Sequence, residues 1–492
     1  MKRIFWLSVL ALGAGFGLRL FFVQKYPTNS TSDTVLYEQM ATNWLHHHVY
    51  AMNVDGGIPP VDLRMPGYPA YLAVVYLLTG RTGEAARHYV MLGQIGVDLC
   101  GCLVTAWLAA LLFSFKRDAG SWERVFLVTL WLAALCPFTA NYTAVPLTEV
   151  FAVLFSGAAY VAMIALIRQA TVRKMGLRKA SWTEDHSEAA LAFLGGLLIG
   201  AGTLFRPETP LLLVVGWIFL AVIWLRKKDY LRGLKLFAIA VAGCVLPLVP
   251  WAVRNAITLH EVQFLAPKNS NLPGELVPNG FMAWERTWLF RMKDCYAAPW
   301  KLNGDDINLG DLPARAFDTP EEKERVGAIL ERYNETDMLT AEEDAAFGRV
   351  AQERTARHPL RTYVWIPALR SLVIWFTPRI ELLPYSGDVF PLKDAWENDR
   401  VDQGVTVGFF LLNILYLALA IGGGWILWRE NAALRVAVAL LVGYLVIRTV
   451  FLTTLETPEP RYVLECFPAI LALGGQVFAG KRKRSETAGV AG

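Results

Sequence analysis

The sequence predicts an all-α protein that crosses a membrane many times. Hydrophobic residues make up 54% of the 492 residues and charged residues only 18%, with a mean hydropathy of +0.36, whereas soluble domains are about one quarter charged. Apolar runs of about 20 residues, the length that a bilayer requires, recur along the chain. The net charge of +4 provides no basic face for a nucleic acid, because the basic residues flank the apolar runs. This composition excludes a disordered chain, a coiled coil and an ordinary cytosolic enzyme.

About ten of the apolar runs are expected to span the bilayer as helices. They cover residues 4–23, 88–114, 123–139, 149–167, 189–205, 209–225, 234–251, 404–427, 434–454 and 462–479. Short loops rich in lysine and arginine are typical of the cytoplasmic side. If the chain crosses the membrane ten times, all of its basic loops lie on the same, cytoplasmic side. These loops are Lys116 with Arg117, 168–179, 226–232, Arg429 with Arg435, and 481–484. We therefore expect an integral protein of a bacterial plasma (inner) membrane, with both termini cytoplasmic and its site facing the periplasm or exterior.

Two further apolar stretches are expected not to cross. Residues 67–79 are too short for a span and follow the Pro66–Pro69 turn, which favours an interfacial or re-entrant helix. Residues 361–377 contain Arg361 and Arg370, so they are expected to form an amphipathic helix on the outer membrane interface.

The remaining outer residues predict a small helical lobe. Residues 301–357 are rich in acids, and the Thr319–Glu322 and Thr340–Glu343 stretches have the capping-box pattern that opens a helix. The chain is therefore expected to divide into three segments. They are a transmembrane module over 1–251 with its first outer loop at 24–87, an extracytoplasmic lobe over 252–403, and C-terminal transmembrane helices with a basic tail over 404–492.

Asp33 is the acid most strongly indicated as a catalytic residue. It opens an amphipathic helix that carries Tyr37 and is expected to lie along the membrane surface. The structural alternative is that Asp33 is merely the N-cap of this helix. The functional alternative is a carboxylate at the boundary of water and lipid, where partial desolvation increases its basicity.

Three arginines from distant parts of the chain are all expected on the outer face. They are Arg64, before the turn that contains Tyr68, Arg206, between two spans, and Arg461, beside Tyr462. Each alone fits an interfacial arginine whose head reaches water. Together they indicate a phosphate site, because a guanidinium binds phosphate through two parallel hydrogen bonds and stays charged.

Further charged residues are secondary candidates. Glu149 is at an outer helix end, where a carboxylate is also favoured by the helix dipole alone. Arg448 and Asp98 lie deeper in predicted spans, where ionisable residues are rare and commonly functional. No metal site is expected, since His46–His48 are consecutive on a helix and point in different directions.

In order and spacing, these motifs resemble the GT-C superfamily of glycosyltransferases that use polyprenyl-phosphate sugars. The resemblance rests on the run Asp33, Tyr37 and Ala41 after the first span, on residues 64–69, and on Thr148-Glu149, Arg206-Pro207 and Arg461-Tyr462. It is strongest to the branch of the protein O-mannosyltransferases and lipid A aminoarabinose transferases, and residues 252–403 have no counterpart in it.

The resemblance implies an inverting glycosyltransferase on the extracytoplasmic face. Asp33 would be the catalytic base, and Arg64, Arg206 and Arg461 would bind the donor phosphate. Tyr37, Tyr68, Glu149, Arg448 and Tyr462 are the secondary candidates. The donor would be a polyprenyl-phosphate sugar, with no other cofactor, and the acceptor a hydroxyl or amine of a glycan, lipid or protein. The alternative is a transporter or flippase of a lipid-linked substrate, although such proteins place polar groups near the midplane in repeated halves, and no repeat is visible here.

Overall fold

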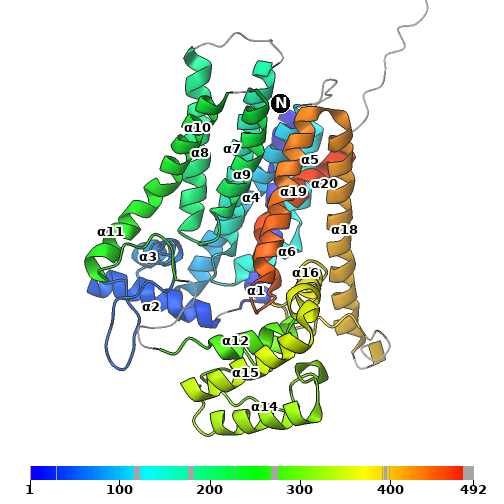
Figure 1. Ribbon diagram of the computed structural model, residues 1–492. Coiled ribbons are helices and arrows are strands. Elements are labelled where there is room, and N and C mark those ends of the chain that lie inside the picture. The colour runs from blue at the N-terminus through cyan, green and yellow to red at the C-terminus, as the bar shows by residue number, and fades with distance from the viewer. Residues whose placement is uncertain are drawn as a thin grey trace, which may run out of the picture. The chain divides into compact units, whose positions relative to one another are not determined.

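The computed structural model describes residues 2–28, 30–115, 122–174, 182–227, 229–267, 275–390, 392, 396–397 and 399–479. Over these residues the chain forms helices and, apart from two isolated bridges, no β-structure (Figure 1). It is an all-α polytopic membrane protein, as the composition predicts. It divides into two compact units, the first comprising 1–266, 380–445 and 464–492, the second 267–379 and 446–463.

The first unit contains the long apolar helices. Its helices are α1 (Lys2–Lys25), α2 (Ser32–His47), α3 (Gly67–Thr79), α4 (Glu84–Phe113), α5 (Trp122–Ala134), α6 (Pro137–Ala140), η1 (Asn141–Ala144), α7 (Glu149–Lys174), α8 (Trp182–Thr203), α9 (Leu211–Lys227), α10 (Tyr230–Val245), η2 (Leu246–Leu248), α11 (Val249–Thr258), α18 (Arg400–Glu430), α20 (Phe467–Gly474) and η6 (Gly475–Phe478). Helix α19 (Ala432–Thr453) and the 3₁₀ segment η5 (Pro460–Cys466) contribute residues to both units.

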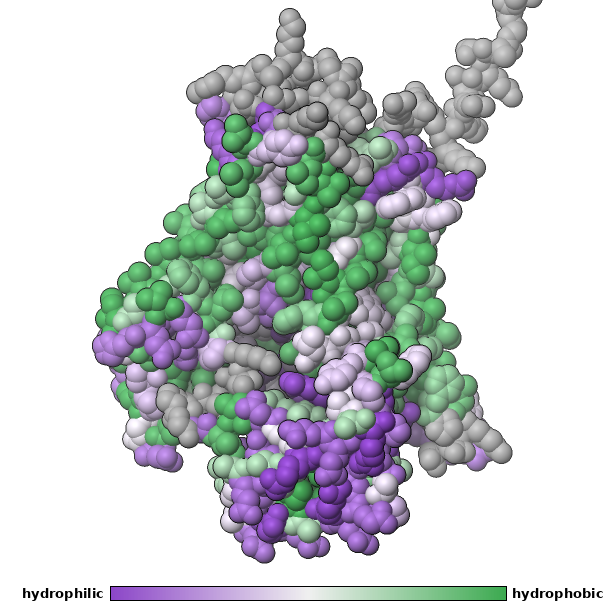
Figure 2. Space-filling view, in the orientation of Figure 1, coloured by the Kyte–Doolittle hydropathy of each residue, from purple (hydrophilic) through white to green (hydrophobic). Residues whose placement is uncertain are grey.

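Among the described residues, six helices are long and apolar enough to cross a membrane. They cover Lys2–Lys25, Glu84–Phe113, Glu149–Ala170, Tyr230–Thr258, Arg400–Glu430 and Ala432–Thr453. Hydrophobic side chains cover the visible sides of this unit's long helices (Figure 2), as contact with lipid requires. Residues 189–205 and 209–225 lie in α8 and α9, and their crossing remains a prediction. Which side of the membrane the basic loops face also remains a prediction, because Lys116, Arg117, 175–179 and 481–484 lie outside the described residues.

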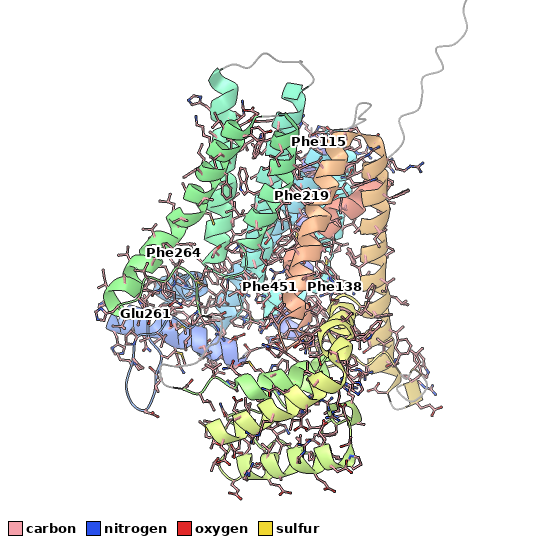
Figure 3. The ribbon with its side chains drawn as sticks, in the orientation of Figure 1. Phe115, Phe138, Phe219, Glu261, Phe264 and Phe451 are labelled. Atoms are coloured by element: carbon pink, nitrogen blue, oxygen red, sulfur yellow. The ribbon has the colours of Figure 1, made fainter. Side chains whose placement is uncertain are left out.

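The predicted span over 123–139 is bent, so the expectation of one regular helix there is wrong. Helix α5 ends at Ala134, and the helical segment from Pro137 to Ala144 leaves at 49°. Pro137 explains the break, because a proline has no N–H to continue the helical ladder. Phe138, which is labelled in Figure 3, fixes the bend by packing its ring 6.0 Å from that of Phe467. Counting the bent pair as one span gives seven.

The predicted span over 462–479 is likewise not a single α-helix. It consists of η5, the eight-residue α20 and η6, and every residue of α20 is buried. A proline near the start of α20 interrupts the hydrogen-bond ladder. The segment packs closely on α18, since a side chain at Gly423 would meet the carbonyl oxygen of Leu473 at 1.8 Å.

A buried ion pair joins α1 to α4 inside the first unit. Arg19 Nη2 lies 2.5 Å from Asp98 Oδ2, with both side chains almost fully buried. The same guanidinium donates to the carbonyl oxygens of Gly15 and Ala134. Asp98, for which the sequence names no partner, is therefore neutralised by Arg19, as a buried charge requires.

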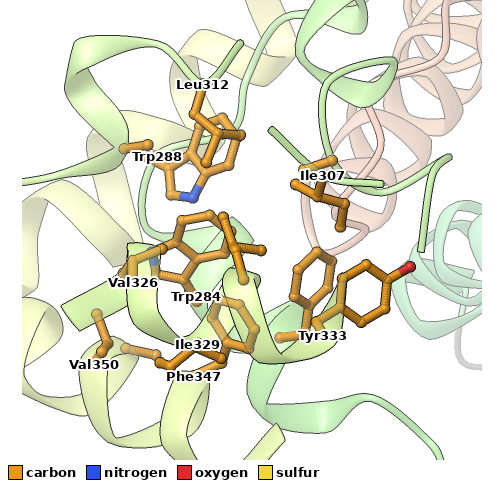
Figure 4. Close-up of a cluster of buried hydrophobic side chains, with 14 of the residues drawn as sticks. Trp284, Trp288, Ile307, Leu312, Val326, Ile329, Tyr333, Phe347 and Val350 are labelled. Atoms are coloured by element: carbon orange, nitrogen blue, oxygen red, sulfur yellow. The ribbon is translucent and has the colours of Figure 1, made fainter. Parts of the chain in front are cut away.

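The second unit has its own hydrophobic core. Its helices are α12 (Asn279–Arg286), α13 (Met292–Cys295), η3 (Ala314–Ala316), α14 (Pro320–Tyr333), α15 (Ala341–Arg357), the π-helical η4 (Arg361–Trp365) and α16 (Ile366–Trp375). Trp284, Trp288 and Phe347 lie at the centre of the core (Figure 4). Hydrophilic side chains cover α14 and α15 (Figure 2), in accord with the acidic composition of this segment.

One predicted capping box is confirmed and the other is half formed. Thr340 Oγ1 accepts the N–H of Glu343, whose carboxylate accepts the N–H of Thr340. Thr319 caps α14 in the same way, but the Glu322 carboxylate accepts the N–H of Asp318 rather than that of the cap. Residues 361–375 are helical, as predicted.

Candidate active site

Asp33 lies in the first turn of α2 and is not its N-cap. The cap is Thr31, whose hydroxyl accepts the N–H of Thr34 at 3.1 Å. The structural alternative for Asp33 is therefore wrong, and the reason is that a threonine two residues earlier already satisfies this N–H. The Asp33 carboxylate instead accepts a hydrogen bond from Arg64 Nη2 at 2.9 Å. With side chains 21% and 24% exposed, respectively, both groups remain accessible to water.

The loop between α2 and α3 holds Arg64 in place. Two isolated bridges, Ala51 with Pro60 and Val54 with Gly57, close this loop on itself. At its base the hydroxyl of Tyr50 donates to the Arg64 carbonyl oxygen at 3.0 Å. These contacts fix the main chain of Arg64, so its side chain can be directed at Asp33.

The start of α3 is attached directly to the turn that carries Arg206. The N–H of Gly67 donates to the carbonyl oxygen of Leu204 at 2.7 Å. A side chain at Gly67 would place its Cβ 2.6 Å from that oxygen, so only glycine allows this approach. The first loop and the Arg206 turn, far apart in sequence, are thereby neighbours.

Arg206 is surrounded by three carboxylates. Its guanidinium lies 3.4 Å from Glu149, 3.1 Å from Glu208 and 3.3 Å from Glu465. Glu465, which is buried, also accepts hydrogen bonds from the hydroxyls of Ser156 and Tyr444. The charge of Arg206 is therefore balanced by protein groups, unlike that of a cation held only for a ligand.

Tyr37 lies near both the Asp33–Arg64 pair and the Arg206–Glu149 pair. Its ring is 5.0 Å from that of Tyr68, whose hydroxyl donates to Gln94. Burial raises the pKa of the Tyr37 phenol, and the charge of Asp33 raises it further. Arg64, Glu149 and Arg206 also act on this pKa, the arginines lowering it and the glutamate raising it. The structure thus brings Asp33, Arg64, Tyr37, Tyr68, Glu149 and Arg206 into one region.

Arg461, Tyr462 and Arg448 form a separate cluster in the second unit. Arg461 Nε forms an ion pair with Glu459 at 2.5 Å, and the Glu459 carboxylate accepts a hydrogen bond from the Tyr462 hydroxyl at 2.7 Å. Arg448 Nε donates to the Tyr462 carbonyl oxygen at 2.7 Å. Their convergence on the Asp33 region remains a prediction.

An apolar cavity of about 380 Å³ lies beside the first loop. It is lined by the end of α2, the start of α3 and the residues from η2 to α11, with Trp44, Tyr50 and Trp251 among its walls. Arg254 also lines it, and its guanidinium lies 5.4 Å from the centroid of the Tyr50 ring and 5.2 Å from that of Trp251. The cavity therefore has apolar walls and one cation.

Arg254 differs from the other arginines of this unit's site in its partners. It donates to the carbonyl oxygens of Tyr50 and Val61 and to the Asn255 side chain. Within the described part of the chain no carboxylate forms an ion pair with it. Arg64 and Arg254 both lower the pKa of Tyr50, which burial raises, so both cations lie near this one phenol.

Sequence reasoning did not single out Arg254 or Glu465. Glu465 falls inside the predicted span 462–479, where any acid is a functional candidate, so this signal was available. Arg254 follows the predicted span 234–251 and resembles an ordinary interfacial arginine in sequence. Over the described residues, no three His, Cys, Asp or Glu side chains are grouped as metal ligands would be.

The chain was compared with protein-family models, curated proteins and solved structures. No family model and no curated protein matches it. It is similar to the archaeal oligosaccharyltransferase AglB from Archaeoglobus fulgidus, solved with an inhibitory peptide and a dolichol-phosphate, at 12% identity and a TM-score of 0.48, over 96% of this chain and 50% of that one. This chain thus spans about half the length of AglB.

It is also similar to ArnT from Cupriavidus metallidurans. The apo form matches at 14% identity and a TM-score of 0.41, over 96% of this chain and 78% of ArnT. The form bound to undecaprenyl phosphate matches at 14% identity and a TM-score of 0.40, over 95% and 77%.

Proposed function

We propose that this protein transfers a sugar from a polyprenyl-phosphate carrier to an acceptor on the extracytoplasmic side of a membrane. The observation that carries the proposal is the water-accessible pair of Asp33 and Arg64, placed beside an apolar cavity that Arg254 lines. Such a transfer needs a base for the acceptor and positive charge for the departing phosphate. The region supplies both.

In the proposed reaction Asp33 accepts the proton of the acceptor hydroxyl or amine. The acceptor atom attacks the anomeric carbon, and the bond from that carbon to the phosphate oxygen breaks. The lipid phosphate leaves with the electron pair, and a guanidinium stabilises its negative charge. Direct displacement by the acceptor, with no covalent glycosyl–enzyme intermediate, predicts inversion of the anomeric centre.

Arg64 and Arg254 are the arginines best suited to the phosphate. Arg64 has Asp33 as its acidic partner, and Arg254 has only neutral ones. A phosphate near Arg254 would extend its isoprenoid chain along the apolar walls of the cavity. Arg206 and Arg461 remain candidates, although the charge of Arg206 is already balanced by three carboxylates.

A transfer assay with matched variants tests the proposal. Full-length protein in nanodiscs is supplied with a panel of radiolabelled polyprenyl-phosphate sugars and extracted envelope acceptors. Asp33→Asn is expected to slow transfer by about 10²- to 10⁴-fold, the usual contribution of a general base, with donor binding retained. Asp55→Asn is the control, since Asp55 is an exposed acid of the same loop and its φ of 47° is one that asparagine tolerates.

The outcomes separate the two classes of function. Transfer by Asp33→Asn at the parental rate would show that the base is wrongly assigned. Movement of labelled lipid between leaflets without a new glycosidic bond would instead support the transporter or flippase alternative.

A further inference from the structure

The helical segment η4–α16 of the second unit carries an apolar face that is exposed among the described residues. Trp365, Leu369, Leu372 and Phe376 follow one another at steps of four, three and four residues, so they share one side of the helix. Trp365 is 62% exposed and Leu372 is 53% exposed. Tyr363, two residues before Trp365 and therefore on another side of the helix, is 71% exposed.

The opposite side of the same helix is buried in its unit. Ile366, Arg370 and Ile374 recur at steps of four and are each at most 5% exposed. Arg370 Nε donates to the carbonyl oxygen of Leu289 at 2.8 Å. The helix is thus held firmly on one side, and its other side is available for contact.

This helix is fixed to the C-terminal turns of α19, which is apolar and long enough to cross a membrane. Trp375 Nε1 donates to Thr449 Oγ1 at 2.9 Å, and Ile374 packs with Leu452 and Val463, all within the second unit. On these turns of α19, Val450 is 61% exposed, and Phe451, labelled in Figure 3, is also exposed. The uncovered apolar face is therefore attached to the end of a lipid-facing helix.

We propose that η4–α16 is a membrane-docking helix whose aromatic and aliphatic face lies in the lipid interface at the C-terminal end of α19. Trp365 is the kind of side chain that prefers this boundary, and Leu369 and Leu372 enter the acyl region. The occupant of the face is phospholipid, because the face continues the lipid-exposed surface of a membrane-spanning helix. The inference does not depend on the proposed transfer reaction.

The neighbouring charges indicate which property of the lipid matters. Arg361 binds Asp318 through two hydrogen bonds of 2.6 and 3.1 Å, and Arg357 pairs with Glu322. Because these cations already have acidic partners, docking should depend on apolar insertion rather than on anionic headgroups. The Arg361–Asp318 pair also connects the docking helix to the start of α14, so docking holds the lobe at the membrane.

Fluorescence quenching in the full-length protein tests this proposal. A bimane label is placed on Trp365→Cys or Leu372→Cys in a Cys100→Ala background, because Cys100 is the exposed native cysteine and the other five are buried. In nanodiscs, lipids carrying a doxyl quencher are expected to quench both positions at least threefold more than Glu331→Cys on exposed α14, whereas aqueous iodide should quench Glu331→Cys most. Unchanged thermal midpoints confirm that the labelled variants are folded.

Three results would overturn the proposal. One is quenching by iodide at positions 365 and 372 that equals quenching at 331, since the face would then contact water. Another is a requirement for anionic lipid, which would replace apolar insertion by headgroup binding. The third is quenching that appears only when two copies share a nanodisc, which would make the face a protein–protein contact.

Discussion

Two ion pairs, one in each unit, show how burial separates a reactive group from a structural one. Asp33 of α2 and Glu322 of α14 both lie in the first turn of a helix, and each pairs with an arginine about 30 residues away. Asp33 and Arg64 are 21% and 24% exposed, whereas Glu322 and Arg354 are both 0% exposed. An exposed pair contributes at most about 1 kcal/mol to stability, so Asp33 and Arg64 can exchange partners with substrate at little cost.

The Glu322–Arg354 pair is closed by further hydrogen bonds. Arg354 donates to the Thr287 hydroxyl and to the carbonyl oxygens of Arg315 and Ala316. With its guanidinium fully occupied, Arg354 has no capacity for a ligand. A carboxylate–arginine pair is therefore structural in the second unit, whereas the corresponding pair in the first loop can bind a substrate.

The largest stability effect is expected at Arg354. Arg354→Met removes the buried one of the two arginines that pair with the Glu322 carboxylate, the other being Arg357, and the loss of one partner of a buried pair costs about 3–5 kcal/mol. We expect a clearly lower thermal midpoint of the purified full-length protein. Arg325→Gln is the control, because the Arg325–Glu353 pair is about half exposed, and it should change stability by no more than about 1 kcal/mol. Equal losses in the two variants would contradict the role assigned to burial.

A smaller effect, on binding rather than folding, is expected at Arg254. Arg254→Gln removes the charge beside the cavity, and a hydrogen bond to a charged group is worth about 1.5–3 kcal/mol, which is roughly a 10- to 150-fold loss of affinity for polyprenyl phosphate. Binding of the sugar-free lipid phosphate to the protein in nanodiscs, followed by native mass spectrometry, measures it.

Arg87→Gln provides the matched control for Arg254. Arg87 belongs to the same unit and is held by Glu38 at 2.8 Å, away from the cavity lining. Its substitution should leave lipid-phosphate affinity unchanged. If Arg206→Gln weakened binding more than Arg254→Gln, the phosphate would belong beside the three carboxylates instead.

Helix starts and apolar runs could be predicted from the sequence, because both depend on residues close together in the chain. The Thr340 cap, the helix at 67–79 and the all-α membrane fold are of this kind. The bend at Pro137 was also encoded locally, but the surrounding hydrophobicity concealed it. For α2, only Asp33 was considered as the cap, whereas the structure has Thr31, two residues earlier, in that role.

The site depends on contacts that no local pattern encodes. Asp33 meets Arg64 across 31 positions, and Arg206 meets Glu465 across 259. Sequence reasoning treated all outer arginines alike, because their type and depth are the same. They differ in the groups that hold them: Arg206 lies against the carboxylates of Glu149, Glu208 and Glu465, and Arg64 pairs with Asp33, whereas Arg254 donates to two carbonyl oxygens and to the Asn255 side chain.

The smallest expected effect concerns the pH dependence of the lobe. Glu285 is 2% exposed, and burial, followed by the charge of Glu456, raises the pKa of its carboxyl well above the usual value, against the opposing effects of Arg370 and Arg286. A carboxyl whose pKa is raised on folding binds its proton more tightly in the folded state. Its contribution to stability is therefore complete below the ordinary pKa of about 4.3 and declines as the pH rises towards the folded value.

Glu285→Gln removes this titration while keeping nearly the same shape. We expect the stability of the variant relative to the parent protein to be higher at pH 8 than at pH 5. The measurement is the difference between their thermal midpoints at each of the two pH values. Glu331→Gln, on the exposed side of α14, should show no such change. If the thermal midpoints of Glu285→Gln and the parent protein differ by the same amount at both pH values, the Glu285 carboxyl does not titrate on unfolding. The contrast between the lobe's buried acids and the accessible Asp33 would then rest on packing alone.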